Sequence, residues 1–183
     1  MPVDKEEAVK ENLDSWDELA SVHAQGSGAE FYRIEQWLAG ESKLAPWEIE
    51  EVGPVVGKSL LHLQGHIGTD ALSWSRAGAT ATGLDYSPSA IREAERFAGM
   101  IGVDDARFVV SRVRDAVESL EGEEFDIVYT GRGALCWLPA PSPWTHITHR
   151  HTDTHSRSRA PSAGQKRAPP NGPVRARRTA ETN

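Results

Sequence analysis

Four short apolar runs lie in the middle of the chain, each with the length and composition of a strand in a parallel sheet. They are residues Ser59–Leu63, Thr80–Leu84, Arg107–Val110 and Phe125–Thr130. Stretches with helical spacing lie between them, over residues 69–77, 88–101 and 113–120. This alternation of strands and helices predicts a doubly wound α/β domain.

About fifty residues of helical pattern precede the first strand. Asp4–Ala20 predicts an amphipathic helix, and apolar clusters at 31–38 and 47–52 predict two shorter ones. Aromatic residues are frequent here: Trp16, Phe31, Tyr32, Trp37 and Trp47. Such residues could form a lid over a ligand, but packing against the sheet is the favoured interpretation for most of them.

The apolar pattern stops at Ala140. Prolines are scattered among Ser, Thr, Arg and His from there to the end, and such a stretch cannot bury enough apolar surface to offset its ordering entropy. We therefore predict a disordered tail over residues 140–183. Residues 141–183 hold eight basic and two acidic residues although the formal net charge of the chain is −7, so the negative charge lies in the preceding part.

The composition of this tail raises two functional possibilities. Histidines spaced two to four residues apart could bind a metal, and arginines could contact phosphates. The histidines are His146, His149, His151 and His155. A flexible, compositionally biased segment is the stronger interpretation for them, so we predict no metal. No aromatic residue follows Trp144, so base stacking has no support and we do not predict a nucleic-acid partner.

Other features of the sequence bear on the cellular compartment of the protein. Cys136 is the only cysteine, which suits a reducing compartment. The charged N-terminal segment has no apolar core typical of a secretory signal, and no apolar run approaches the length of a membrane span. These features predict a cytoplasmic protein without membrane association, and they give no signal for an oligomeric state.

A glycine-containing loop joins the first strand to the next helix. It is followed, seventeen residues after Gly68, by Asp85 at the end of the second strand. Glycines and a helix N-terminus let backbone N–H groups approach a nucleotide, and an acidic residue at the tip of the next strand can hold ribose hydroxyls. This pattern by itself is also consistent with an ordinary βαβ unit that binds no nucleotide, although nucleotide binding is the favoured interpretation.

Four segments together carry a family resemblance. LLHLQGHIG, GLDYS, ARFVVSRV and FDIVYTGRGALCWLP follow one another in the order and spacing of the class I S-adenosylmethionine-dependent methyltransferases. The resemblance covers about residues 12–139. It implies a Rossmann-like α/β fold: a partial parallel sheet of about four strands with helices on both faces, an N-terminal helical segment before it and the disordered tail after it. The corresponding division is 1–56, 57–139 and 140–183.

The resemblance also implies where the cofactor S-adenosylmethionine binds. The loop would lie under its methionine and ribose, Asp85 would hold the ribose hydroxyls, and Tyr86 would lie against the adenine. Ser87 would also contact the cofactor. Arg112 and Val113 would lie near the adenine amino group, and Thr130 and Gly131 would border the methyl-transfer pocket, with Leu135 and Trp137 nearby. The loop residues are Leu63, Gln64, Gly65, His66, Ile67 and Gly68.

Some positions depart from the family pattern. His62 stands where the family usually has an acid, Gln64 and His66 stand where it commonly has glycines, and Arg112 replaces a usual acid. The family sheet has seven strands, yet no strand pattern follows the fourth one here. We therefore expect a truncated or frameshifted chain that changes character soon after Pro139.

Three functions remain open at this stage. The first is methyl transfer to an unidentified small-molecule acceptor. The second is an inactive fragment that binds the cofactor weakly or not at all. The third is a nicotinamide-dependent oxidoreductase, although QGHIGT at residues 64–69 lacks the G-x-G-x-x-G fingerprint. No catalytic residue is assigned: His23 and His66 are the candidate bases, and we expect His23 to be solvent-exposed and His66 to contact ligand or backbone.

Overall fold

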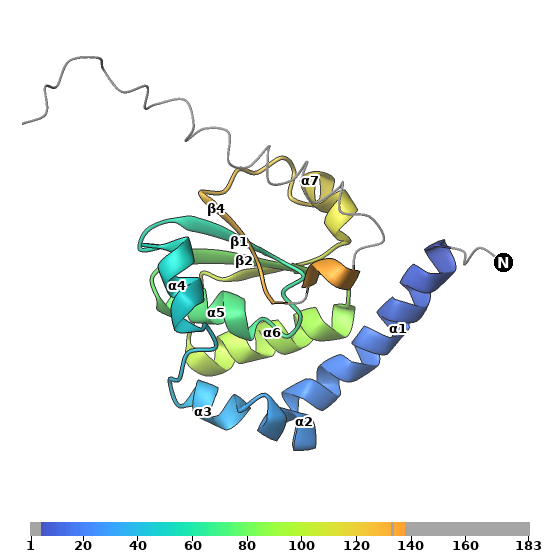
Figure 1. Cartoon of the computed structure of the whole chain (residues 1–183), viewed down its shortest axis with the longest axis horizontal. Helices are drawn as coiled ribbons and strands as arrows, with labels where there is room; N and C mark the ends of the chain where they lie inside the picture. Colours follow the sequence, from blue (N-terminus) through green and yellow to red (C-terminus); the bar gives the residue numbers. More distant parts are fainter. Residues whose placement is uncertain (1–4, 133, 138–183) are drawn as a thin grey trace, which may run out of the picture.

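The computed structural model describes residues 5–132 and 134–137, and within them it contains one sheet of four parallel strands. The strand order is β3-β2-β1-β4 (Figure 1). The strands are β1 (Ser59–Leu63), β2 (Thr80–Asp85), β3 (Arg107–Val110) and β4 (Ile127–Thr130). The prediction of a partial parallel sheet of about four strands is confirmed.

Helices cover both faces of this sheet, as predicted. The segment before β1 forms α1 (Lys5–Ala24), α2 (Gly26–Phe31), α3 (Ile34–Leu38) and α4 (Pro46–Val52). The crossover helices are α5 (Thr69–Arg76), α6 (Pro88–Ile101) and the short α7 (Ala116–Ser119). Two single turns of 3₁₀-helix complete the described chain, η1 (Val113–Asp115) and η2 (Ala134–Trp137).

Alternation along β1 divides the core between the two faces. Leu61 and Leu63 point to the face covered by η1 and α7, where they pack in one cluster with Ala116 and Leu120. Leu60 points to the opposite face and packs with Trp74 of α5. Since successive strand residues face opposite sides, His62 lies on the α5 face, beside its register partner Tyr129.

The first helix is anchored to the start of α6. Figure 1 shows α1 running past the N-terminal end of α6. Asp17 of α1 accepts hydrogen bonds there from the Ser89 N–H and from the hydroxyls of Ser87 and Ser89, at 2.7–2.8 Å. The predicted α6 boundaries are confirmed, because the Ser87 hydroxyl caps Ala90 N–H and Gly102 ends the helix at φ 67°.

Two details differ from the sequence-based expectation. The fourth strand begins at Ile127 rather than at Phe125, because the Asp126 carboxylate accepts hydrogen bonds from Ser59 N–H and its hydroxyl in place of ladder pairing. The aromatic residues of the N-terminal helices also divide in role: Trp37 is fully buried, whereas Phe31 is 82% and Trp47 50% exposed. Tyr32 is half-buried against the core cluster that contains Trp37, and Trp16 is half-buried as well, so only Phe31 and Trp47 depart from the expectation that these residues pack.

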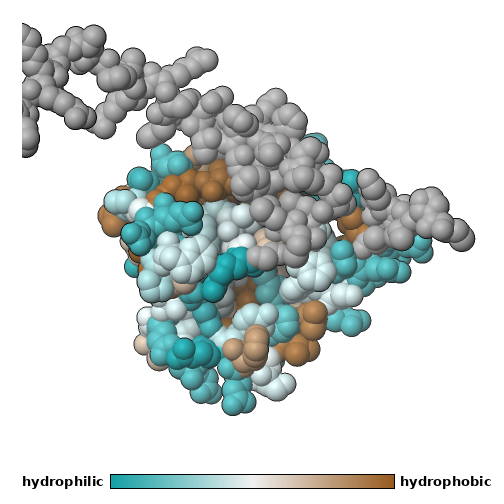
Figure 2. Space-filling model, in the orientation of Figure 1, coloured by the Kyte–Doolittle hydropathy of each residue, from teal (hydrophilic) through white to brown (hydrophobic). Residues whose placement is uncertain are grey.

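The surface is mainly hydrophilic on the face shown in Figure 2, with hydrophobic residues in small separate groups. No helix in the described part of the chain is long and apolar enough to cross a membrane. The expected start of the first helix at Asp4, the histidine cluster and the tail after Pro139 lie outside the described residues. The division 1–56, 57–139 and 140–183 stays a prediction.

Candidate cofactor-binding site

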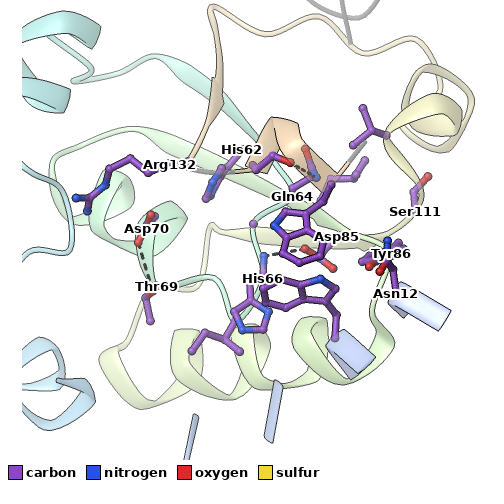
Figure 3. Close-up of a pocket in the computed structure, with 18 of the residues that line it drawn as sticks. Asn12, His62, Gln64, His66, Thr69, Asp70, Asp85, Tyr86, Ser111 and Arg132 are labelled. Atoms are coloured by element: carbon purple, nitrogen blue, oxygen red, sulfur yellow. Dashed lines mark hydrogen bonds between the residues drawn. The ribbon is translucent and has the colours of Figure 1, made fainter. Parts of the chain in front are cut away.

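A cavity of about 840 Å³ opens beyond the carboxyl ends of the four strands. Residues that follow all four strands line it, and α1 and α2 contribute further side chains. Ligands of open α/β sheets bind at this edge, and the volume is that of a small-molecule site. The polar lining residues, most of them labelled in Figure 3, include Asn12, Lys43, His62, Gln64, His66, Asp70, Asp85, Tyr86, Ser111 and Arg132.

The loop after β1 adopts left-handed backbone at three positions. Gly68 has φ 76°, and a Cβ atom there would lie 2.5 Å from the Ala94 Cβ of α6. Glycine at this position therefore permits both the turn and the close approach of two helices. Gln64 (φ 56°) and His66 (φ 46°) adopt the same backbone region with side chains present, at about 1–2 kcal/mol of strain each.

Asp85 holds this loop in place from the end of β2. One carboxylate oxygen accepts the His66 N–H and the other accepts the Ser87 N–H, both at 2.9 Å. The side chain is 6% exposed, and burial raises the pKa of Asp85, against the lowering effect of these backbone hydrogen bonds. Because each carboxylate oxygen has two lone pairs, Asp85 retains capacity to accept hydroxyl hydrogens from a ligand.

Aromatic rings cover the loop from the side of α1. His23 Nδ1 lies 2.9 Å from His66 Nε2, and Trp16 stacks edge-on against both His66 and Trp137. The expectation that His23 is solvent-exposed was wrong. His23 is half-buried, and its ring centroid lies 4.6 Å from that of Tyr32. Burial lowers the pKa of His23 and, together with the His23 charge, lowers that of His66 to about 4.

A second polar group lies at the α5 side of the cavity. It contains His62 of β1 and Asp70 from the first turn of α5, with Glu48 of α4 behind them. Glu48 is 4% exposed and accepts hydrogen bonds from the Tyr129 hydroxyl at 2.8 Å and from Ala45 N–H at 2.7 Å. Arg132 Nε lies 3.6 Å from the same carboxylate.

The structure brings most of the predicted site residues to one cavity. Gln64, Gly65, His66, Ile67, Asp85, Tyr86, Arg112, Val113 and Gly131 line it. Leu63, Gly68 and Ser87 are instead buried beneath it, where they support the strand, the loop and α6, and Thr130 is half-buried outside the lining. The roles assigned to these residues stay predictions.

Sequence reasoning missed other lining residues, chiefly Asn12, Lys43, Asp70, Ser111 and Arg132. Asp70 and Ser111 each lie within two residues of a predicted site residue, so their position after a strand or loop could have indicated them. Asn12 and Lys43 line the cavity because of the way the N-terminal segment packs. No local pattern in the sequence predicts this packing.

The fold and this cavity define a nucleotide-binding α/β domain of the Rossmann-like type. Residues 64–152 match a family model described as "Methyltransferase domain". This match confirms the resemblance of that stretch to the S-adenosylmethionine-dependent methyltransferases. No protein with a curated description matches the sequence.

Solved structures give the same architecture. One, titled "Conversion of a Disulfide Bond into a Thioacetal Group during Echinomycin Biosynthesis", is 30% identical with a TM-score of 0.50, over 63% of this chain and 48% of that one. The MccD protein is 21% identical with a TM-score of 0.50, over 58% and 46%. The chain thus spans about half the length of these structures, and the second likeness concerns the fold alone.

Proposed function

We propose that this chain binds S-adenosylmethionine in the cavity and transfers its methyl group to a small-molecule acceptor. The observation that carries the proposal is the position of Asp85, buried at the tip of β2 with both oxygens already held by backbone N–H groups. A carboxylate fixed in this way is oriented before any ligand arrives, and it can accept the ribose hydroxyls without rearrangement.

The residues present fit the cofactor in size and chemistry. The cavity volume of about 840 Å³ can hold both a nucleoside and an acceptor. Tyr86 follows Asp85 into the lining, and Ser111 and Arg112 line the cavity after β3, where the adenine would lie. When bound, the cofactor supplies an activated methyl group on a sulfonium centre.

The contribution of the protein is positioning and exclusion of water. Methyl transfer requires the acceptor atom to lie in line with the methyl group in a dry pocket. Trp16 and Trp137, whose ring centroids lie 5.2 Å apart, cover the cavity next to His66 and would limit water access there. Their contact joins α1 to the segment after β4.

The acceptor belongs to the proposal as well. The 30% identical structure carries a title that concerns conversion of a disulfide bond to a thioacetal. A small molecule with a thiol or disulfide is therefore the first class of acceptor to screen. Neither candidate base is free: His23 and His66 are hydrogen-bonded to each other, and burial lowers the pKa of both, which makes each a weaker base.

A second candidate function is a folded chain with little affinity for the cofactor. The features that favour it are the side chains of Gln64 and His66, which adopt left-handed backbone in the loop, and the contact of His23 with that loop. β4 also pairs on one side only, with β1, among the residues described. No observation favours the nicotinamide-dependent oxidoreductase.

Calorimetric titration with S-adenosylmethionine and S-adenosylhomocysteine separates these candidates. We expect saturable binding to the purified chain and a loss of at least tenfold in affinity for Asp85→Asn, because an amide accepts through only one of its two polar atoms. Asp104→Asn, at an exposed loop position, is the matched control and should bind as the parent chain does. A folded, monodisperse sample that binds neither ligand would support the second candidate.

A further inference from the structure

His62 is a buried polar residue without a partner. It is 2% exposed, it lines the cavity, and neither ring nitrogen has a hydrogen bond within the described chain. Its closest ring neighbour is Tyr129, with centroids 4.9 Å apart. Buried polar groups nearly always have a partner, so an orphaned imidazole that faces a cavity points to a water or ligand group.

Asp70 lines the same cavity, and its carboxylate is poorly hydrogen-bonded. Its carboxylate has one hydrogen bond among the described residues, a long one of 3.4 Å from the Thr69 hydroxyl. Burial, followed by the negative charge of Glu48, raises the pKa of Asp70 to about 6 against the lowering effect of the Arg132 and Lys43 charges, so Asp70 is largely ionised at pH 7. An ionised and poorly hydrogen-bonded carboxylate in a cavity requires a donor.

The two side chains meet beside Gly131. A Cβ atom built on this glycine would lie 3.5 Å from His62 Nε2 and 3.6 Å from Asp70 Oδ2. The small space next to the Gly131 backbone is therefore flanked by an imidazole nitrogen and a carboxylate oxygen from different elements. Figure 3 shows His62 and Asp70 on this side of the cavity, away from Asp85 and Tyr86.

The chemistry of these groups selects the ligand. Burial lowers the pKa of His62 to about 4, so the ring is neutral at pH 7 and Nε2 can offer its lone pair. A neutral imidazole and an ionised carboxylate together suit a cationic donor, and a primary ammonium has three N–H groups for them.

We propose that His62 and Asp70 form a binding site for a primary ammonium group beside Gly131. Two ligands could supply that group, the amino-acid end of the cofactor or an amine on the acceptor. The proposal rests on the proposed function, because both sources are ligands of the same cavity. Asp70, carried by a helix, would then supply the negative charge at an edge where β1 itself carries a neutral histidine.

The first experiment compares three ligands by calorimetry on the parent chain, Asp70→Asn and the control Asp104→Asn. S-adenosylhomocysteine carries an amine and a carboxylate, its decarboxylated analogue carries the amine alone, and 5′-methylthioadenosine carries neither. If the cofactor supplies the ammonium, Asp70→Asn should weaken the first two about 10- to 100-fold and leave 5′-methylthioadenosine within about twofold. An equal loss for all three ligands would mean a structural effect and would overturn the proposal.

The second experiment tests an acceptor amine. Ethylamine is titrated against the chain saturated with S-adenosylhomocysteine, and the ring signals of His62 are followed by NMR. Saturable shifts in the parent chain that disappear in Asp70→Asn and weaken in His62→Gln support the site. If these shifts are absent and Asp70→Asn has also left all three nucleoside ligands unaffected, the ammonium site does not exist.

The same NMR experiment separates this proposal from the proposed function. If the parent chain binds no nucleoside ligand, methyltransferase function fails while the site remains testable with ethylamine alone. Shifts of the His62 signals that depend on Asp70 would then uphold the ammonium site, and their absence would overturn it. Circular dichroism and thermal unfolding establish that each variant is folded, and His62→Gln gives an independent test if Asp70→Asn does not fold.

Discussion

The two ends of the cavity differ in how their polar groups are satisfied. Asp85 accepts two backbone N–H groups at 2.9 Å, and Ser87, one of its donors, is in turn hydrogen-bonded to Asp17 of α1. Asp70 has one hydrogen bond of 3.4 Å, and His62 has none in the described chain. Burial raises the pKa of both carboxyls.

The two ends therefore differ in what satisfies their buried polar groups: the protein itself at Asp85, and a ligand at Asp70 and His62. The Asp85 end is completed by the fold itself, so its geometry also contributes to stability. The Asp70 end leaves acceptors open, and an unpaired buried polar group costs about 1–3 kcal/mol. Such a cost is retained where a ligand removes it. Loss of Asp85 should therefore reduce both stability and binding, whereas loss of the Asp70 or His62 side chain should mainly alter binding and pH dependence.

The largest expected change is a loss of stability on substitution of Gly68, the residue that precedes the helix carrying Asp70. In Gly68→Ala the new methyl group would lie 2.5 Å from Ala94 Cβ and 2.9 Å from Phe108 Cε1, in left-handed backbone. Strain and overpacking together should lower the free energy of unfolding by about 2–5 kcal/mol. Urea unfolding measures this loss.

Gly102→Ala is the matched control for this substitution. Gly102 has φ 67°, but nothing lies within 4 Å of its added Cβ. This variant should therefore lose only the backbone contribution of about 1–2 kcal/mol. Equal losses in the two variants would mean that the close approach of the loop to α6 does not matter, and that the Asp70 end is not held by this contact.

The second prediction concerns pH and compares His62 with Asp70. The folded-state pKa of His62, about 4, lies below its unfolded value of about 6.5, so the unfolded chain binds this proton first as the pH falls. Stability is therefore lost below pH 6.5, by about 2 kcal/mol at pH 5 from this residue. His62→Gln should remove that part of the decline.

Asp70 acts in the opposite direction over an overlapping range. Its folded-state pKa of about 6 lies above its unfolded value, so the folded chain binds this proton first as the pH falls from 6 to 4, and stability rises. Asp70→Asn should therefore steepen the loss of stability on acidification, while His62→Gln makes it shallower. Urea unfolding at pH 7 and pH 5 tests both, and parallel changes in all three chains would contradict the buried state of this end.

Much of the fold and the Asp85 end follow from local sequence. Apolar runs predicted the strands, helical spacing over 88–101 predicted the limits of α6, and the end of the second apolar run placed Asp85 at a strand tip. These features depend on neighbours within a few residues, whose periodicity and capping chemistry are readable directly. The start of β4 was misjudged because the contact of Asp126 with Ser59 spans distant parts of the chain.

The Asp70 end of the cavity and the contact between His23 and His66 could not be predicted in the same way. His62, Asp70 and Gly131 come from β1, α5 and the residue after β4, and their proximity is a property of strand order rather than of spacing. His23 is similar, because nothing around it in sequence indicates that α1 brings it to His66. Tertiary packing determines the partners of such residues, so these contacts cannot be predicted from amino-acid composition or hydrophobic periodicity.

The smallest expected effect lies where α1 extends the Asp85 end. Asp17→Ala removes three acceptor contacts, from the Ser87 hydroxyl and from the hydroxyl and N–H of Ser89, and should cost about 1–2 kcal/mol. Asp14→Ala, one turn earlier and exposed, should change stability by less than about 0.5 kcal/mol. Because the Ser87 N–H still binds Asp85 in the Asp17 variant, hydrogen exchange should accelerate in α1 and leave the loop at His66 protected. Equal acceleration in both segments would mean that the Asp85 end depends on α1 and is not completed by the sheet and loop alone.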